Sequence, residues 1–440
     1  MEILVKAAQL LLSLSILVIF HEFGHFITAK FFKTRVEKFY LFFNPWFSLF
    51  KFKKGETEYG LGWLPLGGYV KISGMIDESM DKEQMQQPPQ PFEFRSKPAW
   101  QRLIIMLGGV TVNILLAIAI YIGMLWLWGE QYLPTSEANK YGIVADSVAQ
   151  EMGLRNGDKI LSVDNEPVED FFKIPGKIIL DNAKTIQVER DGQPFNVMIP
   201  EGFLARLLKH QSPDFINARM PFVIAGFSAE SAAKAAGVLE GDRIVGINDL
   251  EVLYFDQFRE LIPEYRNQDI NLKVLRQADT LTFNFRLPES GLIGAMTNPA
   301  DHFTFKDKQY SFLAAIPAGF TRTWKGVGNY LKQLKLIFSP EAKAYESVGG
   351  FITIGNIFPS TWDWQAFWSL TAFLSIMLAI LNVLPIPALD GGHVMFLFYE
   401  IITGRKPSDK FLEYAQIVGM VLLFGLLIFA NGNDIVKLFR

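Results

Sequence analysis

The stretch LLLSLSILVIFHEFGHFITAKFF, from Leu10 to Phe32, constrains how the rest of this chain can be arranged. It is long enough to cross a bilayer as a helix, because about 20 apolar residues span the hydrocarbon core. Its second half carries His21, Glu22 and His25 within the apolar run. Ionisable groups at membrane depth are energetically costly, so a functional site is their default interpretation.

The spacing of these three side chains is that of a metal site. Residues four apart lie on one face of a helix, so His21 and His25 can hold one metal ion. Glu22 lies about 100° round the helix from His21 and can reach a water on that metal. The pattern is the HExxH arrangement of zinc proteases. Two simpler alternatives are a chance match in a buried helix and a soluble zinc enzyme with an apolar core. Three polar groups in metal-ligand order disfavour chance.

Composition narrows the class of protein. The chain has 440 residues, of which 50% are hydrophobic, and its mean hydropathy is positive. These values are typical of a membrane protein with substantial soluble parts. A net charge of −3 gives no indication of nucleic-acid binding. The absence of cysteine excludes disulfides and thiolate ligands, which leaves histidine and carboxylate side chains as the strong metal ligands.

Hydropathy predicts a polytopic α-helical membrane protein with about four transmembrane helices. The predicted spans are Ile3–Phe31, Leu103–Trp128, Phe367–Leu384 and Phe411–Phe429. The first lacks a basic start and a small-residue cleavage site, so we expect it to be retained rather than removed as a signal peptide. Lysine and arginine are concentrated between spans one and two and between spans three and four, which places both connections in the cytoplasm. The long segment 130–362 is then outside.

The first cytoplasmic connection has β-strand character. Leu49–Lys54 and Glu58–Ile72 are rich in aromatic and β-branched residues, with glycines as breaks. They predict one or two β-hairpins, and their apolar character indicates that these hairpins enter the membrane beside the metal site. Non-helical backbone at that depth must be covered by protein or line a wet cavity. Met80–Gln90 is polar and predicts a loose loop.

The segment 130–290 contains an internal repeat with an offset of 84 residues. Ten identities fall within 30 positions, against roughly two expected from ordinary composition. The first copy contributes Gly142, Ala145, Ser147, Ala149, Gly153, Gly157, Asp158, Ile160, Val168 and Phe171, which match Gly226, Ala229, Ser231, Ala233, Gly237, Gly241, Asp242, Ile244, Val252 and Phe255. The repeat predicts a duplicated domain. Each copy resembles a bacterial PDZ domain, a fold that binds extended peptides at a sheet edge. A spacer that binds nothing is the alternative.

The segment 311–338 has apolar residues at spacings of three and four with basic residues between them. It predicts an amphipathic helix with a break near Pro317. Such a helix fits the membrane surface, a substrate, or the repeated domains.

A catalytic zinc needs a third protein ligand. Metzincins supply it within HExxHxxGxxH, but Thr28 and Phe31 occupy those positions here. The better candidate is Asp390 in LNVLPIPALDGGH, Leu381–His393, where we expect it to end an apolar span. Gly391 and Gly392 would let the backbone turn tightly beside it.

The two distant motifs together carry a family resemblance. HEFGH in the first span and N-x-x-P-x-x-x-L-D-G-G-H, from Asn382 to His393, resemble the site-2 protease family of intramembrane zinc metalloproteases. L-P-L-G-G-Y-V-K at Leu64–Lys71, the four spans and the two repeats narrow the resemblance to the bacterial RseP type with two PDZ domains. Phe351, in VGGFITI, departs from the proline that the family often has there.

The resemblance implies a site and a fold. Zinc would be held by His21, His25 and Asp390, with Glu22 catalytic. Asn382 and Pro385 would hold the substrate backbone. Apart from the resemblance, we expect the hairpin around Trp63–Lys71, which contains Gly67 and Gly68, to offer the substrate an edge strand. A hairpin that only fills the fold is the alternative. His393 would be structural, because a fourth protein ligand would close the zinc site. The fold would join the membrane helices to membrane-associated β-hairpins and two extracytoplasmic α+β PDZ domains.

The predicted domains are an N-terminal membrane half at 1–129, PDZ domains at 130–215 and 216–290, an amphipathic connector at 291–362 and a C-terminal membrane half at 363–440. The resemblance implies cleavage of single-pass membrane proteins, such as an anti-sigma factor or signal-peptide remnants, in the bacterial inner membrane, with the PDZ domains on the periplasmic side. The lipid bilayer is the other expected partner. The competing hypotheses are a membrane-tethered PDZ scaffold with a structural or inactive metal site, and a polytopic zinc protease that cuts soluble substrates.

Overall fold

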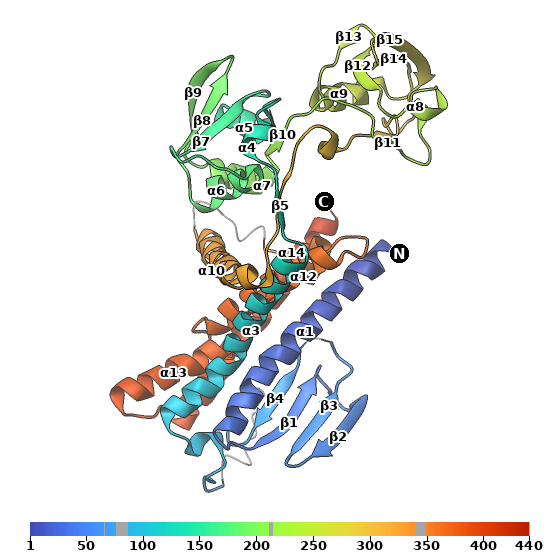
Figure 1. Ribbon diagram of the computed structural model, residues 1–440. Coiled ribbons are helices and arrows are strands. Elements are labelled where there is room, and N and C mark those ends of the chain that lie inside the picture. Colours follow the sequence, from blue (N-terminus) through green and yellow to red (C-terminus); the bar gives the residue numbers. More distant parts are fainter. Residues whose placement is uncertain (66, 76–86, 211–213, 340–347, 440) are drawn as a thin grey trace. The chain divides into compact units, whose positions relative to one another are not determined.

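The computed structural model describes residues 1–65, 67–75, 87–210, 214–339 and 348–439 (Figure 1). The chain divides into two compact units. The first combines Met1–Gly129, Gln309–Lys335 and Tyr345–Arg440, and most of the second is Glu130–Lys308. The first unit contains both motifs that the sequence singles out, so it holds the candidate site.

Four helices of the first unit are long and apolar enough to cross a membrane. They are α1 (Glu2–Phe31), α3 (Ala99–Leu127), α12 (Trp364–Val383) and α14 (Asp409–Leu438). All four predicted spans are therefore confirmed as helices of spanning length. The third ends at Val383, directly before the proline-rich turn, and the fourth is longer than predicted at both ends.

Small residues let α1 and α3 pack closely. A β-carbon on Gly24 of α1 would lie 2.2 Å from the carbonyl oxygen of Gly108 on α3. Close approach of backbones through small residues is the usual way that helices associate in membranes. Hydrogen bonds then connect α12 to both helices, from Ser375 Oγ to the Asn113 carbonyl at 2.8 Å and from Thr371 Oγ1 to Ser13 Oγ at 3.0 Å. These hydrogen bonds join α12 to α3 and to α1.

A four-stranded sheet lies beside the C-terminal half of α1 (Figure 1). Its order is β2-β3-β1-β4. The strands are β1 (Val36–Leu41), β2 (Phe50–Lys54), β3 (Thr57–Leu61) and β4 (Tyr69–Ile72). The β2–β3 hairpin was expected from the sequence. However, β1 was not, and its parallel pairing with β3 and antiparallel pairing with β4 turn the predicted hairpins into one mixed sheet. The predicted loop at Met80–Gln90 falls mostly in 76–86, outside the described residues.

The chain between α12 and α13 (Asp390–Thr403) departs from the prediction. Asp390 begins a helix and does not end a span. The turn lies earlier, where Ala388 has a φ of 82°. Gly391 is required for close packing, because a β-carbon there would lie 2.1 Å from the carbonyl oxygen of Leu384. The turn and the first turn of α13 therefore form one tight structure that places Asp390.

The amphipathic segment forms one continuous helix, α10 (Phe312–Ile337), with Pro317 inside it, so the predicted break is absent. Its small residues face α3 and α12, since a β-carbon on Gly319 would lie 2.6 Å from Ile122 and one on Gly326 would lie 2.9 Å from Ile376. The remaining described helices of this unit are η1 (Phe94–Ser96) and α11 (Phe351–Ile357).

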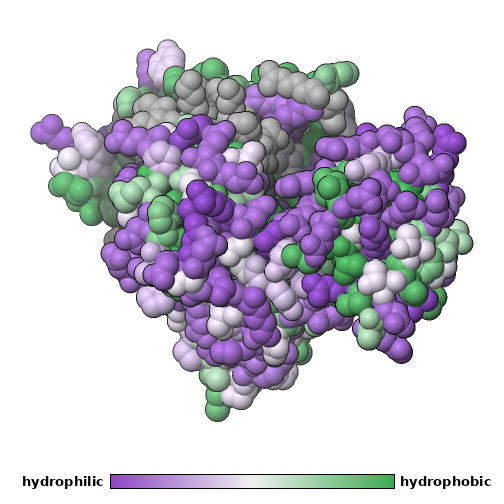
Figure 2. Space-filling view, turned by 90° about the horizontal axis from the view of Figure 1, so that it is seen from above, coloured by the Kyte–Doolittle hydropathy of each residue, from purple (hydrophilic) through white to green (hydrophobic). Residues whose placement is uncertain are grey.

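The second unit contains two lobes with separate hydrophobic cores. The first lobe contains β5 (Glu130–Tyr132), α4 (Thr135–Ala138), β6 (Ile143–Ala145), α5 (Ser147–Met152), β7 (Lys159–Val163), η2 (Phe171–Lys173), α6 (Ile174–Leu180), β8 (Thr185–Arg190), β9 (Gln193–Met198), α7 (Phe203–His210) and β10 (Ile216–Ala218). The second contains β11 (Gly226–Phe227), α8 (Ala232–Ala235), β12 (Arg243–Ile247), β13 (Leu250–Glu251), α9 (Phe255–Leu261), η3 (Ile262–Tyr265), β14 (Asp269–Arg276), β15 (Asp279–Arg286) and β16 (Ala295–Met296). After it come η4 (Pro299–Asp301) and β17 (Lys306–Lys308), and β17 pairs with β5 of the first lobe. The face in Figure 2 is largely hydrophilic, with apolar residues in scattered groups.

The internal repeat reappears in the contacts of the two lobes. In the first lobe, the carboxylate of Asp158 accepts hydrogen bonds from the Arg190 guanidinium at 2.7 and 2.8 Å. In the second, Asp242 accepts equivalent bonds from Arg276, both at 2.7 Å. Each aspartate also accepts from a backbone N–H three residues earlier. The Gly-Asp turn of each copy is therefore fixed by the same ion pair.

Candidate metal centre and active site

The two histidines of the HExxH motif face one point from α1. Their Nε2 atoms are 3.3 Å apart, and Oδ2 of Asp390 lies 3.2 Å from each of them. His21 and His25 are 9% and 7% exposed, so their rings are shielded from bulk water. Within the part of the chain that the structure describes, this is the one group of three such side chains whose donor atoms converge. The three predicted ligands are thus brought together from segments 365 residues apart.

The chemistry of this donor set fits a metal ion. Two imidazole nitrogens and one carboxylate oxygen converge, with all ligand atoms within 4.8 Å of one another. Three such ligands with an open fourth position are typical of catalytic zinc sites. Nδ1 of His25 donates to the Ile105 carbonyl at 2.9 Å, so this ring would bind zinc through Nε2. His21 would also bind through Nε2, which faces Nε2 of His25 and Oδ2 of Asp390.

A cavity of about 500 Å³ opens beside these ligands. Glu22 and Asn382 both line it, and Asn382 Nδ2 lies 3.3 Å from Nε2 of His21. The whole of β4 lines the cavity as well, and the backbone of Val70 hydrogen-bonds to the Glu22 carboxyl group. The cavity therefore has room for a polypeptide segment between a strand edge and the metal ligands.

The other predicted substrate-binding residues are divided by the structure. Gly68 lines the cavity, and a β-carbon there would lie 3.7 Å from Cγ of Glu22. Gly67 has a φ of 144° and faces the Phe43 ring instead. Pro385 belongs to the turn before α13 and is not among the lining residues of the cavity. Of the four predicted residues, Asn382 and Gly68 are therefore the two beside the metal ligands.

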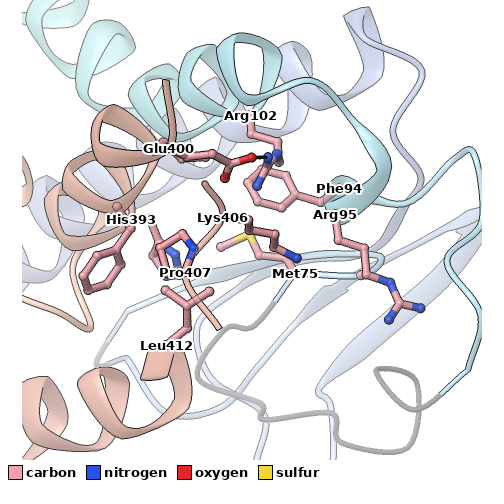
Figure 3. Close-up of a pocket in the computed structure, with 12 residues that line it drawn as sticks. Met75, Phe94, Arg95, Arg102, His393, Glu400, Lys406, Pro407 and Leu412 are labelled. Carbon is pink, nitrogen blue, oxygen red and sulfur yellow. Dashed lines mark hydrogen bonds and ion pairs between the residues drawn. The ribbon is translucent and has the colours of Figure 1, made fainter. Parts of the chain in front are cut away.

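A small neighbouring cavity shows how α13 is held (Figure 3). Arg102 of α3 and Glu400 of α13 point toward each other, and Nη2 donates to Oε1 at 2.5 Å. Both side chains are largely buried, which makes this ion pair far less screened than a surface pair. His393 lines this cavity and the larger one, and it is not part of the donor group. The ion pair anchors the helix whose first residue is Asp390.

Sequence reasoning missed one face of α3 that supports the histidines. Ile105, Gly109 and Asn113 are spaced four residues apart, so they lie on one side of the helix. The Ile105 carbonyl accepts from His25, and Asn113 Nδ2 lies 3.2 Å from Nδ1 of His21. A β-carbon on Gly109 would lie 2.4 Å from Nε2 of His25. The sequence does carry a signal for this face, since a polar residue such as Asn113 within an apolar span marks a functional candidate.

A buried HExxH pair on an apolar helix of spanning length, with a distant aspartate from the start of α13 beside it, defines a membrane metalloprotease centre. The chain belongs to peptidase family M50, whose model matches residues 9–426. Proteins of Rickettsia conorii and Treponema pallidum, both named as candidate zinc metalloproteases, are each 28% identical to it over 97–98% of both chains. The Regulator of sigma E protease of Haemophilus influenzae is 26% identical over all of both chains. The site-2 protease resemblance is thereby confirmed at the family level, and the protein is a metalloprotease.

Proposed function

We propose that this protein is an intramembrane zinc metalloprotease, which hydrolyses a peptide bond within or near the transmembrane segment of single-pass membrane proteins. The proposal rests on one observation: the side chains of His21, His25 and Asp390 converge beside Glu22. His21, Glu22 and His25 lie on the spanning helix α1, and Asp390 is the first residue of α13, which follows the turn after the spanning helix α12. A site at that depth selects substrates that reach it through lipid, because soluble polypeptides remain in water.

A few side chains would carry out the hydrolysis of the peptide bond. His21, His25 and Asp390 would hold zinc, which when bound supplies Lewis-acid activation of water and of a carbonyl group. Glu22 accepts the proton of the attacking water as general base and delivers it to the leaving amide nitrogen as general acid. Asn382 donates its amide hydrogen to the carbonyl oxygen as negative charge develops there.

A transmembrane substrate must also be unwound, because a helix shields its carbonyl carbons within i→i−4 hydrogen bonds. The outer edge of β4 supports this role. β4 is the last strand of the sheet, and no other strand of the described residues pairs with that edge. Because strand addition satisfies backbone groups that a helix satisfies internally, a substrate segment can pair with β4 at little net cost. Gly68, Val70 and Ile72 then hold the substrate extended beside Glu22.

The remaining parts of the proposal are what membership of the family implies for the second unit, the aromatic hairpin and the substrates. The two lobes of the second unit are the PDZ domains predicted at 130–215 and 216–290, and they lie on the periplasmic side of a bacterial inner membrane. The first lobe extends past its predicted end to include β10, and the second extends to include β16. They admit substrates whose outer domain has already been trimmed. The aromatic hairpin β2–β3 is associated with the membrane, since Phe50 and Phe52 of β2 and Trp46 before it expose their rings. The substrates are anti-sigma factors or signal-peptide remnants, consistent with the name of the Haemophilus influenzae relative.

The test compares the wild type with Glu22→Gln on a model single-pass substrate in detergent, with zinc content measured for both. We expect the wild type to cut, and Glu22→Gln to retain zinc without cutting, because glutamine cannot accept the proton. If neither protein cuts any of several truncated substrates although each holds one zinc, the metal site is structural. The hypothesis of a membrane-tethered PDZ scaffold is then correct.

A further inference from the structure

We propose that Asn113 is a positioning residue for the metal ligand His21, and that its side-chain oxygen accepts the Nδ1 hydrogen of His21 when Nε2 binds the metal. This inference rests on the metal site of the proposed function and assigns a further residue to it. Asn113 lies in the middle of α3 and is fully buried.

The geometry fixes which nitrogen of His21 can bind a metal. Nε2 lies 3.2 Å from Oδ2 of Asp390 and 3.3 Å from Nε2 of His25, so it faces the point where the ligands converge. Nδ1 is on the other side of the ring and faces Asn113. A neutral imidazole carries one N–H, so metal at Nε2 places the hydrogen on Nδ1. Nδ1 of His21 therefore needs a hydrogen-bond acceptor.

His25 already makes the kind of hydrogen bond that we propose for His21. Its Nδ1 donates to the Ile105 carbonyl at 2.9 Å, which fixes its tautomer and leaves Nε2 free for the metal. Histidines that bind metals almost always donate their second N–H to such an acceptor, which orients the ring. Ile105 and Asn113 lie on the same face of α3, two turns apart. One helix therefore offers a partner to each histidine.

The amide group of Asn113 is turned the wrong way for a metal-bound His21. Its Nδ2 lies 3.2 Å from Nδ1 of His21, and an amide N–H cannot bond to an imidazole N–H because both are donors. Its Oδ1 is buried and has no hydrogen-bond partner among the described residues. A half-turn of the amide places Oδ1 against the Nδ1 hydrogen and satisfies both groups. A buried acceptor without a partner is costly, so metal binding and the amide turn favour each other.

A purely structural role for Asn113 uses a different atom. The backbone carbonyl of Asn113 accepts from Ser375 Oγ at 2.8 Å and thereby joins α3 to α12. Substitution of the side chain leaves that carbonyl in place. The two roles are therefore separable: a side-chain change tests the contact with His21, and Ser375→Ala tests the contact between the helices.

The experiment measures zinc affinity of the full-length protein in detergent, by competition with a chromophoric chelator. Asn113→Leu keeps the branching at Cγ and the number of heavy atoms, and it removes the acceptor. Its zinc affinity should fall by about 10–100-fold, the usual effect of losing such a partner. Asn113→Asp retains an oxygen acceptor and should bind zinc at least as tightly as the wild type. Ser375→Ala is the matched control and should leave zinc affinity unchanged.

The outcomes separate this inference from the proposed function. Equal zinc affinity of Asn113→Leu and the wild type, or an equal loss in Asn113→Leu and Asn113→Asp, would overturn the role of Asn113 and leave the metal site intact. If Asn113→Leu does not fold, Asn113→Asp is tested alone with Co²⁺. We expect the Co²⁺ complex of Asn113→Asp to have an absorption spectrum shifted from that of the wild type. Binding of Co²⁺ that is tenfold weaker than in the wild type would overturn the inference. A wild type that binds no zinc overturns the proposed function as well.

Discussion

Gly109 of α3 lies directly against His25 of α1: a β-carbon at position 109 would stand 2.4 Å from Nε2 of His25. The same β-carbon would lie 2.6 Å from Cε1 of His21. Both contacts are far shorter than carbon and nitrogen atoms tolerate, so the histidine rings occupy the space that any larger residue at 109 would need. The position of the metal ligands therefore depends on a glycine in a neighbouring helix.

Gly109→Ala should displace both rings by roughly 1 Å. A displacement of that size at a reacting centre costs about 100-fold in rate, so we expect kcat/KM and zinc affinity to fall together. Gly123 is the matched control, because it lies on the same helix and a β-carbon there meets nothing within 4 Å. Gly123→Ala should keep wild-type activity and zinc content. Full activity in Gly109→Ala would show that the rings are not confined by α3.

The sequence predicts the elements and ligands whose signals are local. Apolar runs predict the four helices, and the i, i+4 spacing within one turn predicts that His21 and His25 face the same way. The sheet was predicted only in part, because β1 is held by pairing with β3 and β4, and no local pattern encodes such a register. Strand propensity alone does not distinguish a hairpin from a mixed sheet.

The residues that support the metal ligands could not be predicted from the sequence, because their contacts are also long-range. Asn113 contacts a histidine 92 residues away, and this pairing exists only once α1 and α3 are packed. The sequence predicts the turn at Gly391 and Gly392, but the positive φ falls on Ala388. The backbone of residues 383–387 occupies the space around Gly391 and Gly392, so these glycines serve packing and not the turn.

Val70→Pro tests the edge strand. Proline removes the N–H of Val70, which contacts Glu22 at the open edge of β4. A lost hydrogen bond to a charged group costs about 1.5–3 kcal/mol, so cleavage of a transmembrane substrate should fall about tenfold or more. Val70→Ala keeps both backbone groups and is the control. If Val70→Pro holds zinc and cuts at the wild-type rate, β4 serves only to fill the fold.

Asp434→Ala should weaken the attachment of α14 to α11. The carboxylate of Asp434 accepts from the backbone N–H groups of Ile352 and Thr353 at 3.0 Å and from Thr353 Oγ1 at 2.5 Å. Removing a charged acceptor from a helix N-terminus costs about 1–3 kcal/mol, so the thermal unfolding temperature in detergent should drop by several degrees. A double-mutant cycle with Thr353→Ala should give a clear coupling energy. Strictly additive effects would contradict the contact.

The ion pair of the second lobe predicts a pH dependence. Arg276 donates two hydrogen bonds to Asp242 and lowers the pKa of that carboxyl group from its ordinary value. A carboxyl group with a lowered pKa in the folded state stabilises the protein above its unfolded-state pKa, and this contribution is lost as the pH falls through the folded-state pKa. Asp242→Asn should therefore lower the urea midpoint of the second unit at pH 7, and the difference from the wild type should shrink below about pH 4. A difference that is constant with pH would contradict the assignment.

The most direct test of the central claim is to locate the bond that the protein cuts. A single-pass membrane protein, tagged in both soluble flanks, is incubated with the purified wild type and with Glu22→Gln, and the product masses are determined by mass spectrometry. The proposed function predicts one cut within or at the edge of the apolar segment by the wild type and none by Glu22→Gln. Cuts only in the soluble flanks, at the same rate in a detached flank, would show that the site serves soluble substrates and would contradict intramembrane proteolysis.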